Sequence, residues 1–375
     1  MIYFDNAATT KPFKEALETF NTTSEKYFYN TASIHQAGKN AAKLLEAARK
    51  QILDLMYLPD YDLVFTSSAT ESNNIAILST LRHKKQFGKT ILTSELEHPS
   101  IVNVLAEMKD EGFIVKYIKT TSVGKIDLED FKEKLDSDVI FVTTMSLNNI
   151  IGSVQPIEQM VKILEDYPKA HFHVDATQGI GKTDIDYKGV DTISISAHKF
   201  NGVKGAGGLF VKTLSNLHPV FYGGGHEYNV RSGTVNLPGI TAMTKALRLT
   251  LEEARSVNIR LNDFNGQIRD AVKDLKSIKV QPKDAPYIVN MSFVGAKGEV
   301  VVNALSKRGI LVSTTSACAS RLAELNETLL ALKNPDDVIE GSIRISMGHY
   351  TTQDDVDALV TALKSVYEEL GDVLK

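Results

Sequence analysis

The sequence predicts an α/β fold in which a large domain with a mostly parallel sheet is joined to a smaller α+β domain. Two observations support this fold class. Short β-rich runs alternate with helical patterns as far as residue 212, which is the pattern of a parallel sheet covered by helices. Beyond that point, a long helical region over residues 238–276 precedes strands and helices in mixed order.

The predicted strands of the large domain are short apolar runs, most of them rich in β-branched side chains. They cover residues 62–66, 89–94, 113–118, 139–145, 171–176, 191–196 and 207–212. Helical patterns lie between them, beginning at Ser68 and continuing through "IVNVLAEMKDEG" and "IEQMVKILEDY". In an open α/β sheet of this kind, ligands bind at the carboxyl ends of the strands.

The second half of the chain supplies the smaller domain. Its predicted strands are residues 287–294, 310–314 and 342–347, and its predicted helices are "EVVVNALSKRG" and "DDVDALVTALKSVYEEL". We predict that residues 13–252 form the large domain with the binding site. Residues 1–12 and 253–375 would then form the small domain, which carries Cys318.

Composition excludes several classes of protein. The net charge is −4, so no basic field favours nucleic acid or an anionic membrane. No apolar run approaches the roughly 18 residues of a membrane helix, and the start "MIYFDNAATT" does not resemble a signal peptide. A single cysteine cannot form an internal disulfide, and there is no Cys/His spacing for a structural metal. We therefore expect a cytoplasmic protein without a metal site.

The first candidate site motif is "FTSSATESNN", residues 65–74. A strand ends there, and Ser68 with Glu71 matches a capping box at a helix start. The free N–H groups of such a start can hold a phosphate, which would lie beside Ala69 and Thr70. The alternative is a helix cap with no ligand, and the motif alone does not decide between the two.

Two further motifs lie at strand ends. Asp175 follows an apolar strand in "HFHVDATQ", with Gln178 three residues later, and "SISAHKFNG" delivers Ser196, His198 and Lys199. A lysine there can form a Schiff base with a carbonyl cofactor. A carboxylate can hold a cationic ring nitrogen, and both lie near an anion site. These are the parts that pyridoxal phosphate needs, although Asp175 alone also fits a solvated loop and Lys199 a surface lysine.

The remaining candidates are more scattered. Thr234 in "RSGT" is suited to a phosphate contact, and Arg344 in "SIRISMG" to a bidentate contact with a substrate carboxylate. His98 in "SELEHPSI" is suited to stacking on an aromatic ring or to acid–base work. Cys318 lies among small and polar residues in "STTSACAS". Each also fits a surface loop, an exposed strand, a helix-start histidine or a buried structural cysteine.

Eight motifs in order carry a family resemblance across residues 3–350: "YFDNAATT", "TSSATESNN", "SELEHPSI", "HVDATQ", "SAHKFNGVKGAGG", "GGGHEYNVRSGT", "SACAS" and "SIRISMG". In this set the chain resembles the cysteine desulfurases of the NifS/IscS type. These belong to class V of the fold-type I pyridoxal-phosphate enzymes, so the resemblance implies that fold and that cofactor.

The resemblance also implies a role for each matching residue. Lys199 would bind the cofactor covalently, Asp175 would pair with its pyridine nitrogen, Gln178 with its phenolic oxygen, and His98 would stack on the ring and handle protons. The phosphate would be held by four residues of one chain and one from the partner subunit of a homodimer. These are Ala69, Thr70, Ser196 and His198, with Thr234 from the partner.

For the substrate, the resemblance assigns the carboxylate of L-cysteine to Asn149 and Arg344. The thiolate of Cys318 would take the sulfur as a persulfide and leave L-alanine. The sulfur would then pass to an acceptor, either a tRNA-thiolation enzyme or an iron–sulfur scaffold. Two departures from the family stand out: Ile150 replaces a glutamate after Asn149, and "RLAELNETLLAL" replaces the usual segment after the cysteine. The second departure is closer to shortened bacterial members that serve tRNA thiolation.

Two alternatives remain at the sequence level. Selenocysteine lyase or another class V pyridoxal-phosphate activity uses the same cofactor residues, although a simple aminotransferase has no need of Cys318. A degenerate sulfur-relay protein without turnover is the alternative that is not an enzyme. The presence of Lys199, Asp175 and Cys318 together argues against it.

Overall fold

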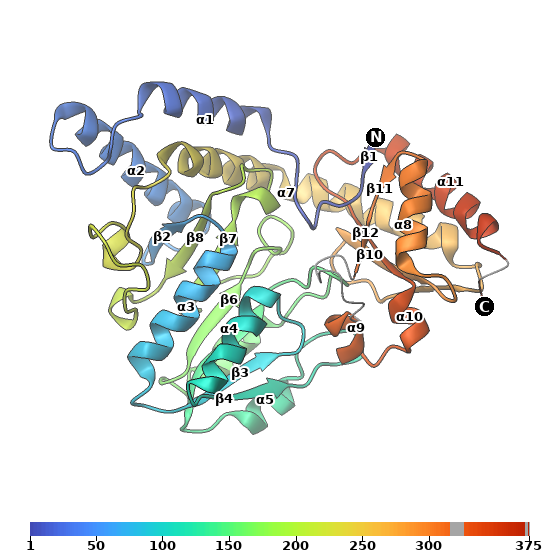
Figure 1. Cartoon of the computed structure of the whole chain (residues 1–375), viewed down its shortest axis with the longest axis horizontal. Coiled ribbons are helices and arrows are strands. Elements are labelled where there is room, and N and C mark those ends of the chain that lie inside the picture. Colours follow the sequence, from blue (N-terminus) through green and yellow to red (C-terminus); the bar gives the residue numbers. More distant parts are fainter. Residues whose placement is uncertain (316–325, 372–373, 375) are drawn as a thin grey trace.

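A twisted sheet forms the centre of the larger part of the molecule (Figure 1). The computed structural model describes residues 1–315, 326–371 and 374. Within these residues the sheet has seven strands in the order β2-β8-β7-β6-β5-β3-β4. They are β2 (Asp62–Thr66), β3 (Thr90–Ser94), β4 (Ile114–Ile118), β5 (Val139–Met145), β6 (His171–Asp175), β7 (Thr192–Ser196) and β8 (Gly207–Val211).

The prediction of a mostly parallel α/β sheet is confirmed. The pairs β3–β4, β3–β5, β5–β6 and β6–β7 are parallel, whereas β8 runs antiparallel to both β2 and β7. The strands β5, β6 and β7 are buried along their whole length, which explains why their sequences are continuous apolar runs instead of alternating ones.

Helices connect and cover these strands (Figure 1). They are α3 (Ala69–Lys84), α4 (Pro99–Asp110), α5 (Leu128–Lys134) and α6 (Ile157–Leu164). Two further helices, α1 (Lys14–Lys26) and α2 (Gln36–Leu55), pack against the long helix α7 (Leu237–Val272). No helix in the described part of the chain is both long and apolar enough to pass through a bilayer.

A second sheet belongs to the C-terminal part. Its order within the described residues is β12-β13-β10-β9, from β9 (Ile278–Val280), β10 (Ile288–Phe293), β12 (Ser313–Thr314) and β13 (Ser342–Ser346). Helices α8 (Gly298–Lys307), α9 (Glu327–Ala331), α10 (Asp336–Glu340) and α11 (Gln353–Glu369) accompany it. The predicted single strand over residues 310–314 is wrong, because β11 (Ile310–Leu311) pairs instead with the N-terminal β1 (Ile2–Tyr3).

Helix α7 joins the two parts. Its first half, with Leu237 and Leu247, packs into the core of the large sheet. Its second half, from Val257 to Val272, packs into the core of the smaller sheet. The change of core falls where the sequence places the domain boundary, near residue 252, and the exact division stays a prediction.

Candidate active site

The candidate residues gather where parallel strands end. Met145, Asp175 and Ser194 lie side by side across β5, β6 and β7, so the loops after these strands leave from one edge of the sheet. Those loops carry Asn149, Gln178 and Lys199. The position is the ligand-binding edge that the sequence predicts for an open α/β sheet.

Asp175 is buried, with 6 % of its surface exposed. Its Oδ2 atom accepts a hydrogen bond from Asn73 Nδ2 at 2.9 Å, and its Oδ1 atom accepts one from the Thr177 amide at 2.9 Å. A carboxylate has about four acceptor positions, so it can receive a further N–H from a ring nitrogen.

Lys199 ends the short 3₁₀ helix Ala197–Lys199, one turn beyond β7. Its Nζ atom donates to the carbonyl oxygens of Ala7 at 2.7 Å and of Ala8 at 2.9 Å. Gln178 Nε2 donates to the same Ala7 carbonyl at 2.8 Å. The structure therefore brings Lys199 and Gln178 together on the N-terminal segment, a contact between distant parts of the sequence.

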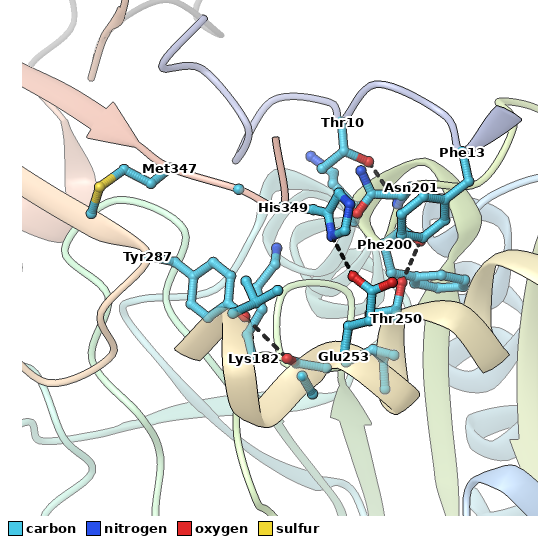
Figure 2. A pocket seen from close by; sticks show the side chains of 16 residues that line it. Thr10, Phe13, Lys182, Phe200, Asn201, Thr250, Glu253, Tyr287, Met347 and His349 are labelled. Atoms are coloured by element: carbon cyan, nitrogen blue, oxygen red, sulfur yellow. Dashed lines mark hydrogen bonds and ion pairs between the residues drawn. The ribbon is translucent and has the colours of Figure 1, made fainter. Parts of the chain in front are cut away.

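A second lysine, Lys182, lies at the same place and was missed by sequence reasoning. Its Nζ atom donates to Gln178 Oε1 at 2.9 Å. Burial, together with the charges of Lys199 and Arg344, lowers its pKa to about 7. Figure 2 shows Lys182 beside Tyr287 in a cavity of about 30 Å³ that Lys199 also lines. The spacing "TQGIGK" after a strand was the signal available in the sequence.

His98 caps the N-terminus of α4. Its Nδ1 atom accepts the Ser100 amide at 3.1 Å and lies 2.9 Å from Ser100 Oγ. Burial is the main cause that lowers the pKa of His98; Lys199 lowers it further, while Asp175 opposes the change. Asn73 links His98 to Asp175, because its amide nitrogen donates both to Ser100 Oγ and to Asp175 Oδ2.

The start of α3 provides the candidate anion site. Ser68 Oγ accepts the Glu71 amide at 3.3 Å, as predicted. The other half of the predicted capping box is wrong, because Glu71 instead accepts from the Ser67 amide at 2.7 Å and from Arg231 Nε at 2.7 Å. A Cβ atom on Gly207 would lie only 2.9 Å from the Ser68 backbone. Glycine there lets β8 approach the helix start closely.

The other predicted phosphate residues differ in their exposure and contacts. Ala69 and Ser196 are buried, with 7 % and 2 % exposed, whereas Thr70 is exposed. His198 Nδ1 lies 3.1 Å from Thr9 Oγ1, and burial lowers the pKa of His198 to about 4. Thr234 is exposed and lines a cavity of about 60 Å³ together with Ser67 of the same chain.

Arg344 and Asn149, the two predicted substrate residues, lie in contact through a backbone atom. Arg344 is buried on β13, and its Nη1 atom donates to the Asn149 carbonyl at 3.1 Å. Its Nη2 atom donates to Asp5 Oδ1 at 2.8 Å, a partner that sequence reasoning missed. Arg344 Nε is buried and meets no acceptor among the described residues.

Ile150 explains one departure from the family pattern. It is 8 % exposed and packs in a small apolar cluster with Ile151, Leu329 and Ile339. The segment after the cysteine therefore supplies an apolar partner for the position where the family has a glutamate. Cys318 itself, assigned as the nucleophile, lies outside the described residues.

These residues fit pyridoxal phosphate. The donor set holds an amine, a buried carboxylate with capacity for one more donor, and a helix start closely approached by glycine. Among the described residues, no group of three or more His, Cys, Asp or Glu side chains could hold a metal ion.

Comparison with known proteins shows the family of the chain. The model of the aminotransferase class-V family matches residues 2–359, and the chain belongs to that family, whose members depend on pyridoxal phosphate. Within it, the chain groups with NifS and IscS proteins. It is 40 % identical to a NifS/IcsS protein homolog of Lactobacillus delbrueckii subsp. bulgaricus, covering 100 % of this chain and 99 % of the relative. It is 35 % identical to the cysteine desulfurase IscS of Dictyoglomus turgidum, covering 98 % and 95 %.

Solved structures show the same fold. A NifS-like protein superposes with a TM-score of 0.91 at 31 % identity, covering 99 % of each chain. A structure of SspA in complex with cysteine superposes with a TM-score of 0.80 at 28 % identity, covering 94 % of this chain and 100 % of the other. The predicted fold-type I architecture is thereby confirmed.

Proposed function

We propose that this chain is a pyridoxal-phosphate-dependent cysteine desulfurase that converts L-cysteine to L-alanine and leaves the sulfur as a persulfide on Cys318. The observation that carries the proposal is the meeting of Lys199, Asp175 and Arg344 around one sheet edge. Relatives named cysteine desulfurase match over almost the whole chain. The assignment of individual residues is part of the proposal.

The chain's residues would hold the cofactor at both ends. Pyridoxal phosphate supplies the electron withdrawal that weakens bonds at the substrate. Lys199 would be the amine that binds its aldehyde carbon, and Asp175 would accept the pyridine N–H. Gln178 would serve the phenolic oxygen, and His98 would cover the ring. The phosphate would bind at the start of α3. The residues that would hold it are Ala69, Thr70, Ser196 and His198, with Thr234 from the partner of a homodimer.

The substrate carboxylate would bind at Arg344. Its fork-shaped guanidinium suits a planar carboxylate, and Asn149 lies next to it. Asp5 already accepts from one end of that fork, so the substrate must either use the remaining donors or replace Asp5. The contact with Asp5 holds Arg344 in one orientation before cysteine arrives. The guanidinium therefore does not have to be ordered during binding.

Sulfur transfer would then involve the thiolate of Cys318, because the thiol form is a poor nucleophile. The thiolate forms an S–S bond with the substrate sulfur while the C–S bond breaks. The electron pair of the broken bond stays with the carbon fragment, which takes up a proton and leaves as alanine. No outside oxidant or reductant is needed until the persulfide is passed on.

A tRNA-thiolation enzyme or an iron–sulfur scaffold would accept the persulfide in the cytoplasm. The segment "RLAELNETLLAL" supports the first of these, because it differs from the form common in the family. A homodimer, in which Thr234 of each subunit would reach the phosphate of the other, is part of the proposal.

Two variants test the proposal. Cys318→Ala should keep the yellow cofactor but lose sulfide release from cysteine in the presence of a reductant. Lys199→Ala should lose the visible absorption band of the covalently held cofactor. Unchanged turnover in the first variant, or an unchanged spectrum in the second, would show that the corresponding assignment is incorrect.

A further inference from the structure

Asp175 is one end of a hydrogen-bonded chain of side chains that extends beneath the sheet edge. The chain runs from Thr192 through His173 and Asn73 to Asp175, and Thr192, His173 and Asn73 are completely buried. His173 Nδ1 lies 3.0 Å from Thr192 Oγ1, and His173 Nε2 lies 3.0 Å from Asn73 Oδ1. None of these three residues contributes to the roles assigned above.

The direction of every hydrogen bond in this chain follows from the charge of Asp175. A carboxylate only accepts, so the atom of Asn73 that faces it must be the amide nitrogen. The amide oxygen then faces His173 Nε2, which must carry the proton. His173 Nδ1 then carries no proton and accepts a hydrogen bond from the Thr192 hydroxyl. Burial lowers the pKa of His173 to about 3, which keeps the imidazole neutral and the direction fixed.

Asn73 is also connected, through Ser100, to His98, the residue proposed to cover the cofactor ring. Its Nδ2 atom lies 2.9 Å from Ser100 Oγ as well as 2.9 Å from Asp175 Oδ2, so both amide hydrogens have acceptors. Ser100 Oγ can then donate to His98 Nδ1, which also accepts the Ser100 amide. His98 Nδ1 therefore holds no proton, and the proton of the neutral ring is on Nε2.

We propose that Asn73, held in one orientation by His173, is a positioning residue that sets Asp175 toward the cofactor nitrogen and His98 in its Nε2–H form. This inference rests on the proposed function, since it needs a cofactor ring between Asp175 and His98. It assigns the pair Asn73 and His173 to the active site although neither touches the cofactor.

Asn73→Ala tests the proposal in the holoenzyme. Loss of a hydrogen bond to a charged group corresponds to a factor of about 10 to 100, so the dissociation constant for pyridoxal phosphate should rise by that factor. Spectral titration measures it. The neighbouring Asn74→Ala is the matched control. Within the described residues Asn74 donates only to the backbone carbonyls of Thr70 and Ser100, so its loss should change affinity by less than about threefold.

Two further comparisons separate positioning from a general structural effect. In an Asp175→Asn background, Asn73→Ala should have little additional effect, because the group through which it acts has already been altered. A full additional loss there would overturn the proposal. His173→Gln places an amide N–H near the position of Nε2 and should keep most of the affinity, whereas His173→Leu should lose about tenfold. Equal affinity in both His173 variants would also overturn it.

The outcomes distinguish this inference from the proposed function. If the unsubstituted chain binds no pyridoxal phosphate or forms no persulfide, the proposed function fails. If the unsubstituted chain is yellow and active but Asn73→Ala binds the cofactor equally well, only the positioning role fails.

Discussion

The buried ion pair between Arg49 and Glu227 offers the sharpest test of how the loop after β8 is held. Arg49 lies on α2, Glu227 lies in the loop before α7, and each is 6 % exposed. The two nitrogens Nη1 and Nη2 of Arg49 each lie 3.0 Å from an oxygen of Glu227. The Phe65 amide also donates to Glu227, at 2.7 Å. We expect Arg49→Met to destabilise the protein because Glu227 would be left buried without its cation.

The size of the effect follows from this geometry. Removing one partner of a buried ion pair costs about 3–5 kcal/mol. The loop adds strain of its own, because Glu227, Tyr228 and Asn229 all have positive φ values, of 46°, 58° and 63°. Such backbone costs roughly 1–2 kcal/mol per residue, so the loop should leave this conformation when the pair is broken. The loop carries Arg231 and Thr234, and the affinity for pyridoxal phosphate should fall with it.

The assay is urea unfolding of the apo-protein followed by far-ultraviolet circular dichroism. Arg49→Met should lower the free energy of the first transition by about 3–5 kcal/mol. The double variant Arg49→Met with Glu227→Gln should recover a large part of that loss, because no buried charge remains. Arg248→Met removes a more exposed pair with Glu252 and should cost under about 1 kcal/mol. A loss below about 1 kcal/mol for Arg49→Met, or no recovery in the double variant, would refute the reasoning.

Three further predictions concern the site and its surroundings. Ile150→Glu should lower the free energy of unfolding by about 3 kcal/mol or more, because it puts a carboxylate into an apolar cluster. The control Ile150→Val should lower it by about 1 kcal/mol. Equal effects of the two variants in urea unfolding would contradict the prediction. Glu97 is buried, and burial raises its pKa to about 8, so the folded chain keeps a proton that the unfolded chain releases above its ordinary pKa of about 4.3. Ionisation of Glu97 should therefore lower the stability of the apo-protein by on the order of 3 kcal/mol as pH rises from 5 to 8. The buried histidines with lowered pKa values act in the opposite direction over part of this range, so the effect is measured as the difference between the unsubstituted chain and Glu97→Gln, and parallel pH curves for the two proteins would exclude it. Arg344→Lys replaces the fork with a point charge and should raise KM for cysteine by about tenfold or more, whereas an unchanged KM would remove Arg344 from the substrate site.

Continuous apolar runs made the strands of the large sheet predictable. The predictions for β2 and β5 agree with the structure at both ends, because a strand buried on both faces has a distinctive composition. Helices α1 and α2 were not predicted. They are stabilised by packing on α7, which begins at Leu237, far later in the chain, and such long-range contacts leave little trace in local sequence.

The site was predictable where a motif places a side chain at a strand end. Asp175 and Lys199 occupy such positions. The residues that orient them were not predictable, because they arrive from elsewhere. Asp5 reaches Arg344 from the N-terminal segment, and Asn73 reaches Asp175 from α3. An ordinary asparagine in a helix gives no sign of its partner until the fold is known.

The most direct test of the central claim is the mass of the peptide that contains Cys318 after the yellow enzyme has been incubated with L-cysteine and digested without reductant. The account predicts a gain of one sulfur atom, lost again on reduction, with L-alanine released in equal amount. A peptide of unchanged mass from enzyme that has its cofactor in place would contradict the account.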